Sequence, residues 1–282
     1  MRDNSLNHIM KRIFANIQAA PISGGFTRVP RSWGNLNFVP AVHKFYFILD
    51  GEGSISIDGC DYEPKPNQLF LLPAGTRQSL ASISNRTFQK YWCHFQASIG
   101  ETDLFRMIDV PHYIDVPEQD IGLLAHLFRE LNCHMSRSEP FAPIMTSSLL
   151  LHLLHFYVER AGIQNMFSQS PLSYENLKTV VNYMENHLRD DVTVPELARL
   201  IHLDTNYFSR LFKDMIGSSP MQYMNRLRLD QAQALLRDTT MTVTEISAAV
   251  GLELHYFSRQ FKAHVGFSPL NYRNMASSMA RR

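Results

Sequence analysis

Two short segments carry serine, arginine and lysine side chains at one shared spacing. The first holds Ser209, Arg210 and Lys213, and the second repeats the same order at 258–262. Each segment also has two phenylalanines four positions apart, which on a helix share one buried face opposite the basic one. An exposed arginine can donate two hydrogen bonds to a guanine, and lysine and serine can bind phosphates. This pattern predicts binding to double-stranded DNA.

Both segments belong to a longer internal repeat. Residues 193–225 align with 242–274 without a gap, and 15 of the 33 pairs are identical. Each copy opens with a capping-box pattern, and a glycine follows its second helix. Helix-turn-helix motifs, which place their second helix in the major groove, are therefore predicted at 193–214 and 242–263. A helix over 221–237 would join them. A solenoid is the structural alternative, although solenoids usually need three or more copies.

Several patterns in this half match one known family: T-V-x-E-L-A, Y-F-S-R-L-F-K, G-S-S-P-x-x-Y and Y-F-S-R-x-F-K. Through them, residues 174–274 resemble the DNA-binding domain of AraC/XylS-type bacterial transcription regulators. The second turn is one residue shorter than is usual in that family, which places Leu254 and His255 at the start of the second recognition helix. The resemblance implies base contacts from Thr205, Asn206, Ser209 and Arg210. The outward faces and the start of the second recognition helix add Lys213, Leu254, His255, Ser258, Arg259 and Lys262 as expected DNA contacts.

The charge of the chain is nearly balanced, with 27 Lys and Arg against 26 Asp and Glu. From Ser173 onward there are 13 basic and 11 acidic residues, so DNA affinity must come from the placement of the charges and from dimerisation. We also expect Arg226, Arg228 and Arg273 near the DNA side. Three widely spaced cysteines favour neither a disulfide framework nor a zinc motif. With no long apolar run and no secretion signal, the expected location is the cytoplasm, without a membrane.

The N-terminal part has a strand-like pattern instead. Residues 54–57 alternate strictly before Asp58-Gly59, and Leu69-Phe70-Leu71-Leu72 reads as a buried strand ending at Pro73. Short strands at this spacing predict a barrel or jelly roll. The order G-E-G, D-G and L-F-L-L-P-A-G-T is similar to the cupin-like sensor domain of the same family. The predicted fold class is thus multidomain α+β, with an all-α C-terminal domain.

An enzyme is the rival interpretation, because cupin-like barrels often hold a metal. The position at which cupins commonly place a metal-binding histidine holds Gln78, and no His-x-His pattern is present. We therefore expect no metal, no cofactor and no catalysis.

Without metal binding or catalysis, the function expected of the barrel is binding of a small molecule. On the strand 89–95, Lys90, Trp92 and His94 share one face. A tryptophan beside polar groups suits stacking on an effector such as a sugar, and the resemblance implies the same role for Trp92. The alternative is that Trp92 is plain core. Gln78, His43 and Trp33 are further candidates for the lining of the effector site, and Arg31 and Leu80 are weaker ones.

Helical spacing predicts a hairpin of helices over 118–135 and 144–160. The second helix has more leucines than one buried face needs, so Leu150, Leu151 and Leu154 are expected at a homodimer interface. The alternative is that this apolar surface packs on the barrel. The predicted domains are a barrel with an N-terminal arm (1–116), a dimerisation hairpin (117–161), a linker (162–173) and a DNA-binding domain (174–282).

Together these patterns predict a transcription regulator controlled by an effector. The resemblance to the family implies an activator that works with RNA polymerase. The alternative is a ligand-independent DNA-binding regulator whose barrel serves dimerisation or partner contact.

Overall fold

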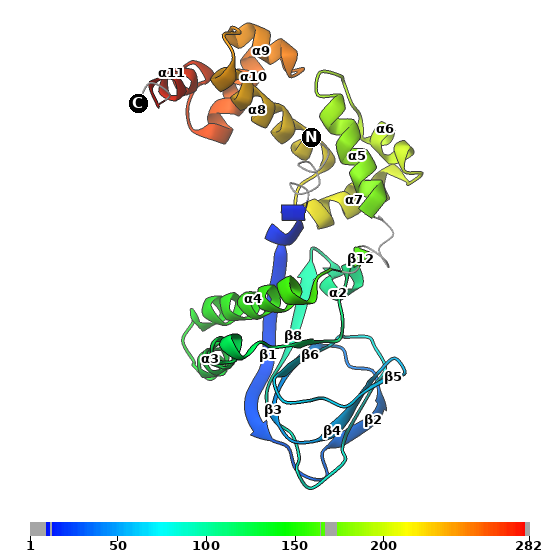
Figure 1. Cartoon of the computed structure of the whole chain (residues 1–282). Coiled ribbons are helices and arrows are strands. Elements are labelled where there is room, and N and C mark those ends of the chain that lie inside the picture. The colour runs from blue at the N-terminus through cyan, green and yellow to red at the C-terminus, as the bar shows by residue number, and fades with distance from the viewer. Residues whose placement is uncertain (1–9, 12, 164, 167–173, 280–282) are drawn as a thin grey trace. The chain divides into compact units, whose positions relative to one another are not determined.

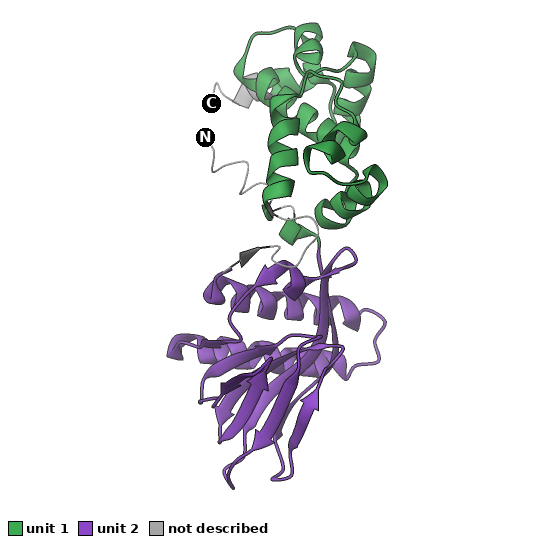
Figure 2. Ribbon diagram, turned by 90° about the vertical axis from the view of Figure 1, so that its right-hand side faces the viewer, with its two compact units in different colours: residues 1–16, 172–282 green, residues 17–171 purple. Residues whose placement is uncertain are grey.

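The chain is described here by a computed structural model covering residues 10–11, 13–163, 165–166 and 174–279. Contacts divide it into two units (Figure 2), of which one comprises residues 17–171 and the other residues 1–16 with 172–282. We call them the strand unit and the helical unit. The sequence had predicted the N-terminal arm as part of the barrel, and a separate hairpin domain. The hairpin instead lies in the strand unit, and the described residues 10–11 and 13–16 group with the helices.

The two larger sheets of the strand unit are antiparallel and face each other (Figure 1). The first sheet has the order β1 (Ile17–Arg28), β8 (Gln89–Ile99), β3 (His43–Asp50), β6 (Gln68–Leu72) and β11 (Tyr113–Asp115), with β9 (Thr102–Asp103) paired to β8. The second has the order β2 (Gly34–Phe38), β7 (Gln78–Ser82), β4 (Gly53–Ile57) and β5 (Cys60–Tyr62). The expected strand-rich N-terminal half is confirmed, as two facing sheets and not as a closed barrel.

The central strands β3 and β8 are buried on both faces, so alternation sends successive side chains to different cores. Phe45 and Phe47 face the helices, where their rings contact Tyr157 and Phe128. Tyr46 faces the space between the sheets, which we call the sandwich interior. Its apolar core comprises Val29, Tyr46, Ile48, Ile55, Ile57, Phe70, Leu72, Leu80 and Phe88.

Helices α3 (Glu118–Met135) and α4 (Ala142–Ala161) lie side by side across the outer face of the first sheet (Figure 1). The predicted bounds of the first helix agree with the structure, and α4 is slightly longer than predicted. Leu150 and Leu154 were expected at a dimer interface, but they are 0% and 3% exposed within this unit. That expectation was wrong because α4 packs against both α3 and β1. Leu151, 38% exposed, does point outward.

A short segment after β9 continues as α2 (Leu104–Met107) and β10 (Ile108–Asp109). Strand β10 pairs with β12 (Asn165–Met166). The predicted linker of 162–173 therefore contains a strand that belongs to the strand unit. Residue 164 and residues 167–173 lie outside the described residues.

The helical unit contains α5 (Tyr174–Asn186), α6 (Val194–Leu200), α7 (Thr205–Ile216), α8 (Pro220–Asp238), α9 (Val243–Ala249), α10 (Leu254–Val265) and α11 (Pro269–Met279). The phenylalanine pairs of α7 and α10 are completely buried, as their four-residue spacing predicts. Helix α8 begins with a capping box from Ser219 and spans the predicted joining helix. Within the described residues, no helix is long and apolar enough to cross a membrane.

The packing of α4 predicts opposite outcomes for two adjacent leucines. Leu150→Ala empties a completely buried site and should lower the free energy of unfolding by about 2–5 kcal/mol. Leu151→Ala, the matched control on the outer face, should change it by about 0.5 kcal/mol or less. Urea denaturation followed by tryptophan fluorescence measures both, since Trp33 and Trp92 both lie in the strand unit. Equal losses would contradict this packing of α4.

Candidate nucleic-acid interface and interior site

The two helix-turn-helix motifs have equivalent N-terminal caps. The Thr193 hydroxyl accepts from the Glu196 N–H, while the Glu196 carboxylate accepts from the Thr193 N–H. Thr242 and Glu245 repeat both bonds in the second motif. These bonds satisfy N–H groups that the first helical turn leaves open. The first helix of each motif therefore begins at an equivalent residue.

The turns are also built alike. His202 (φ 56°) and Gly251 (φ 69°) both adopt left-handed backbone. The next residue in each copy donates its N–H back to the first helix, at 3.0 Å in one motif and 2.9 Å in the other. Asp204 and Glu253 then cap α7 and α10 through their carboxylates. Helix α10 thus begins with Leu254 and His255, as predicted, in the same register as α7.

The outward faces of α7 and α10 are polar and basic. Of the residues predicted to contact DNA, the exposed ones are Asn206, Arg210, Lys213, His255, Arg259 and Lys262, and the partly buried ones are Thr205, Ser209, Leu254 and Ser258. The guanidinium of Arg210 lies 5.6 Å from the Tyr207 ring, and that of Arg259 lies 5.7 Å from the Tyr256 ring. Within the described part of the chain, no carboxylate forms an ion pair with the four cationic side chains. These groups are therefore available to phosphates and bases.

Two arginines expected near the DNA side have a different role. Arg228 is 7% exposed and donates to the backbone carbonyls of Leu188 and Asp190, at 2.8 and 2.7 Å. Arg273 donates to the carbonyls of Leu236 and Met241. Both guanidinium groups hold loops against helices, so the DNA-side expectation was wrong for them. Arg226 is exposed on α8.

A second group of polar residues lies in the sandwich interior. The Lys90 ammonium lies over two aromatic rings, 3.1 Å from the ring centroid of Tyr46 and 4.2 Å from that of Trp33. Lys44 donates to the Gln78 side-chain oxygen at 3.0 Å, and its ammonium lies 4.3 Å from the Phe38 ring centroid. Both lysines are almost completely buried.

The half-buried rings of Trp92 and His94 lie on the same face of β8 as Lys90. The Trp92 and His94 ring centroids are 4.9 Å apart, and the indole N–H of Trp92 donates to the Thr27 hydroxyl at 3.2 Å. His94 pairs across the sheet with Lys44, and Trp92 pairs with Tyr46. Trp92 packs against the interior core while remaining partly exposed. Five of the six candidate effector residues, Trp33, Gln78, Lys90, Trp92 and His94, thus surround this interior.

His43, the sixth candidate, does not line the interior. Its side chain lies on the opposite face of β3, where it contacts the rings of Phe95 and Phe105. Its Nε2 lies 2.9 Å from the Asp103 carboxylate, and its Nδ1 accepts from the Ala74 N–H. His43 therefore holds the β9–α2 segment against the sheet. Of the weaker candidates, Leu80 is part of the interior core and Arg31 is exposed.

Lys44 is the interior residue that the sequence analysis missed. Its position in the sequence indicates an inward side chain, because Lys44 is two positions before Tyr46 in a strand whose other face carries phenylalanines. Alternation alone places Lys44 on the same face of its strand as Tyr46. Its position beside His94 depends on the pairing of β3 with β8, which could not be derived from either segment by itself.

Burial and mutual repulsion shift the protonation of these groups. Burial lowers the pKa of Lys44 to about 8. Burial and then the nearby Lys44 hold the pKa of Lys90 well below its ordinary value. For His94, burial together with Lys44 and Lys90 lowers the pKa to about 4. The interior thus disfavours positive charge.

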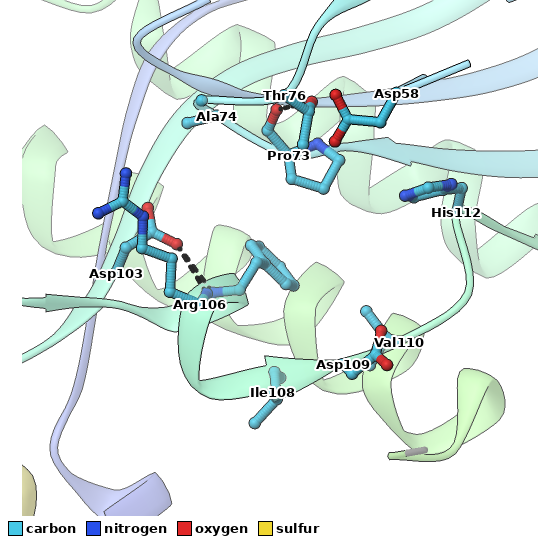
Figure 3. Close-up of a pocket in the computed structure, with 12 residues that line it drawn as sticks. Asp58, Pro73, Ala74, Thr76, Asp103, Arg106, Ile108, Asp109, Val110 and His112 are labelled. Carbon is cyan, nitrogen blue, oxygen red and sulfur yellow. Dashed lines mark hydrogen bonds between the residues drawn. The ribbon is translucent and has the colours of Figure 1, made fainter. Parts of the chain in front are cut away.

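A separate polar cavity of about 300 Å³ lies around α2 and β10 (Figure 3). Its charged and imidazole lining residues are Arg106 and Asp103 on one side and Asp58, Asp109 and His112 on the others. The Asp103 carboxylate accepts the N–H groups of Phe105 and Arg106, which fixes the start of α2. Among the described residues, no group of three or more His, Cys, Asp or Glu side chains is placed to hold a metal.

Comparison with known proteins gives matches to both halves. Residues 31–154 match the family model "AraC-like ligand binding domain", and residues 197–275 match "Helix-turn-helix domain". The probable transcriptional regulator LumQ of Photobacterium leiognathi is 25% identical, over 67% of this chain and 72% of its own. The lactose operon transcription activator of Staphylococcus xylosus is 24% identical, over 69% and 70%. A solved AraC-type DNA-binding regulator from Chromobacterium violaceum is 26% identical, covering 36% of this chain and 92% of its own, with a TM-score of 0.35.

The lowered pKa of His94 predicts how stability depends on pH. In the unfolded chain His94 takes up a proton near pH 6.5, whereas in the folded chain it does so only near pH 4. Between these values the unfolded state binds more protons, so acidification from pH 6.5 to 4 lowers the free energy of unfolding. His94→Gln should reduce this loss, measured by urea denaturation at several pH values. His112, whose pKa is also lowered by burial, contributes to the slope that remains.

The exposed His126→Gln is the control and should leave the pH dependence of the wild type unchanged. A His94→Gln variant with the full wild-type slope would show that His94 takes up its proton at the same pH in the folded and the unfolded chain.

Proposed function

The chain belongs to the AraC-type family of transcriptional regulators, and we propose that it is an activator controlled by a small molecule bound in the sandwich interior. In this proposal α7 and α10 bind operator DNA in the cytoplasm, and the bound protein works together with RNA polymerase. The observation that carries the DNA part is the pair of exposed basic helices on equally constructed motifs. Both relatives are transcription regulators by name, which favours a protein without catalytic activity.

Arg210 and Arg259 are the residues that we propose to read bases. Each is exposed at an equivalent position of its recognition helix, beside a tyrosine ring, and an arginine can bind a guanine with two hydrogen bonds. Lys213 and Lys262, one turn further on, suit phosphate contacts. Leu254 offers only apolar contact, such as to a thymine methyl group, where the first motif has Thr205. The second motif should therefore discriminate less between sequences.

The proposed effector site is the half-buried end of the sandwich interior. Trp92 and Trp33 supply aromatic faces there, and Gln78 and His94 supply hydrogen-bonding groups, a combination that suits a sugar-like molecule. One relative is by name a lactose operon activator, which agrees with a sugar-related effector. In the alternative, a ligand-independent regulator, these polar groups would have no ligand to bind.

We also propose a homodimer formed through the outer face of α4. Ile144 (71% exposed), Met145 (46%) and Leu151 (38%) lie on this face, and Phe141 (74%) immediately precedes the helix. Spacings of three, four and seven residues place such side chains in one stripe. The helical unit carries few excess positive charges, so two copies on one operator would supply affinity that a single copy lacks.

Replacing Arg210 tests the DNA interface. Arg210→Ala should weaken binding to the cognate operator by about 1–3 kcal/mol, because the paired hydrogen bonds to a base are lost. Arg210→Lys keeps the charge but not the paired geometry, so it should bind with reduced sequence preference. Gel shifts on cognate and altered operators measure both effects. Arg129→Ala on α3 is the control for the change in charge, and unchanged affinity and preference in Arg210→Ala would refute the assignment.

Charged substitutions on α4 test the dimer. Ile144→Glu and Leu151→Glu should give monomers with weaker operator binding, while the strand unit stays folded, because both side chains lie outside its core. Analytical ultracentrifugation and gel shifts measure the two effects. Ile83→Glu, at an apolar residue after β7 whose exposure of 57% lies between those of Ile144 and Leu151, is the control and should remain dimeric. A wild-type chain that sediments as a monomer at micromolar concentration would exclude this dimer.

A further inference from the structure

Two lysines are buried in the sandwich interior without an acidic partner. Lys44 is 5% exposed and Lys90 is 3% exposed. Among the described residues, no carboxylate forms an ion pair with either ammonium. Lys44 has the neutral side-chain oxygen of Gln78, and Lys90 has only the faces of Tyr46 and Trp33.

This arrangement is costly for the folded protein. Lysine is almost never completely buried unless it is paired, because removing an ammonium from water is unfavourable. Here two ammonium groups lie close enough for Lys44 to disfavour the charge on Lys90. The other titratable groups that face them are His94 and Tyr46, and neither supplies a counter-charge, since burial raises the pKa of the Tyr46 hydroxyl. A bound group of opposite charge would offset this cost.

We propose that the molecule bound in the interior is an anion, whose carboxylate or phosphate oxygens accept hydrogen bonds from the ammonium groups of Lys44 and Lys90. This inference rests on the proposed effector role of the interior and specifies the chemistry of the effector. The anionic group replaces the missing counter-charge. The rest of the molecule stacks on Trp92, whose ring is partly exposed beside the two lysines.

The surroundings of the lysines are consistent with an entrance at this end. Trp33, Phe38, Trp92 and His94 are all only partly buried, so solvent reaches their rings. Phe38 is the last residue of β2, the edge strand of the second sheet, and the rest of that strand is exposed. A neutral sugar in the same place would satisfy hydrogen bonds but would leave both charges uncompensated. An acid or a phosphate ester of a sugar combines the stacking surface with the charge.

The test compares matched neutral and anionic probes on the full-length chain. D-glucose, D-glucuronate, D-glucose 6-phosphate, acetate and inorganic phosphate are titrated at constant ionic strength, followed by tryptophan fluorescence and melting temperature. The anionic probes should bind at least about tenfold more tightly than glucose, the gain expected from hydrogen bonds to a charged group. The response to glucuronate as against glucose 6-phosphate separates a carboxylate from a phosphate. Equal responses to the neutral and anionic members would overturn the proposal.

Lysine variants locate the site. Lys44→Met and Lys90→Met should lose the preference for anions, whereas Lys65→Met, at an exposed lysine between β5 and β6, should keep it. Anion binding that persists in both interior variants would overturn the assignment. The stability of the ligand-free protein gives a second readout that needs no probe to bind. Removing an unpaired buried charge should raise the melting temperature of Lys90→Met, and a clear decrease would show that the charge is already compensated.

Operator binding separates this inference from the proposed function. If a neutral sugar changes operator affinity and the anions do not, the effector role stands and the anion proposal fails. If the anions bind through Lys44 and Lys90 but leave operator affinity unchanged, the site is an anion site and its role as an effector site fails.

Discussion

Burial of β3 and β8 on both faces is the constraint on which the strand unit depends. Helices α3 and α4 cover one face of these strands and the second sheet covers the other, so the side chains of β3 are buried from His43 to Ile48 and those of β8 are buried or half-buried from Gln89 to Phe95. Each residue is assigned to one core or the other by its position in the alternation. This brings an aromatic core beneath the helices, and it also forces Lys44 and Lys90 into the interior, where their long side chains cannot extend into solvent.

The interior therefore combines apolar packing with polar groups that a purely structural core would not contain. Its deeper part, built from residues such as Ile48, Ile55 and Leu80, holds the sheets together. Around Lys44, Lys90 and His94 the same sheets hold basic groups whose charged forms are disfavoured by burial. A ligand that supplies opposite charge would bind among groups that the two sheets bring together, and its binding energy would offset a cost that the folded protein already carries.

In the helical unit, the same local features orient both recognition helices. Buried phenylalanine pairs at a spacing of four residues fix which face of α7 and α10 is inward, and capped turns of equal construction fix where each helix begins. The basic side chains are then outward by geometry. Arg228 and Arg273 show that basic residues close in sequence to this surface can have another function, since their guanidinium groups hold backbone carbonyls.

The amino-acid sequence by itself determined the features that depend on neighbours along the chain. The repeat, the caps at Thr193 and Thr242, the range of α3 and the face shared by Lys90, Trp92 and His94 could all be predicted, because helix and strand periodicity and capping are local. Pairing between distant segments was decided only by the tertiary structure. It placed Lys44 beside His94, turned His43 toward Asp103 and buried Leu150 while leaving Leu151 exposed. In each case the side chain's environment comes from a strand or helix far away in sequence, and a local pattern contains no information about which face that partner covers.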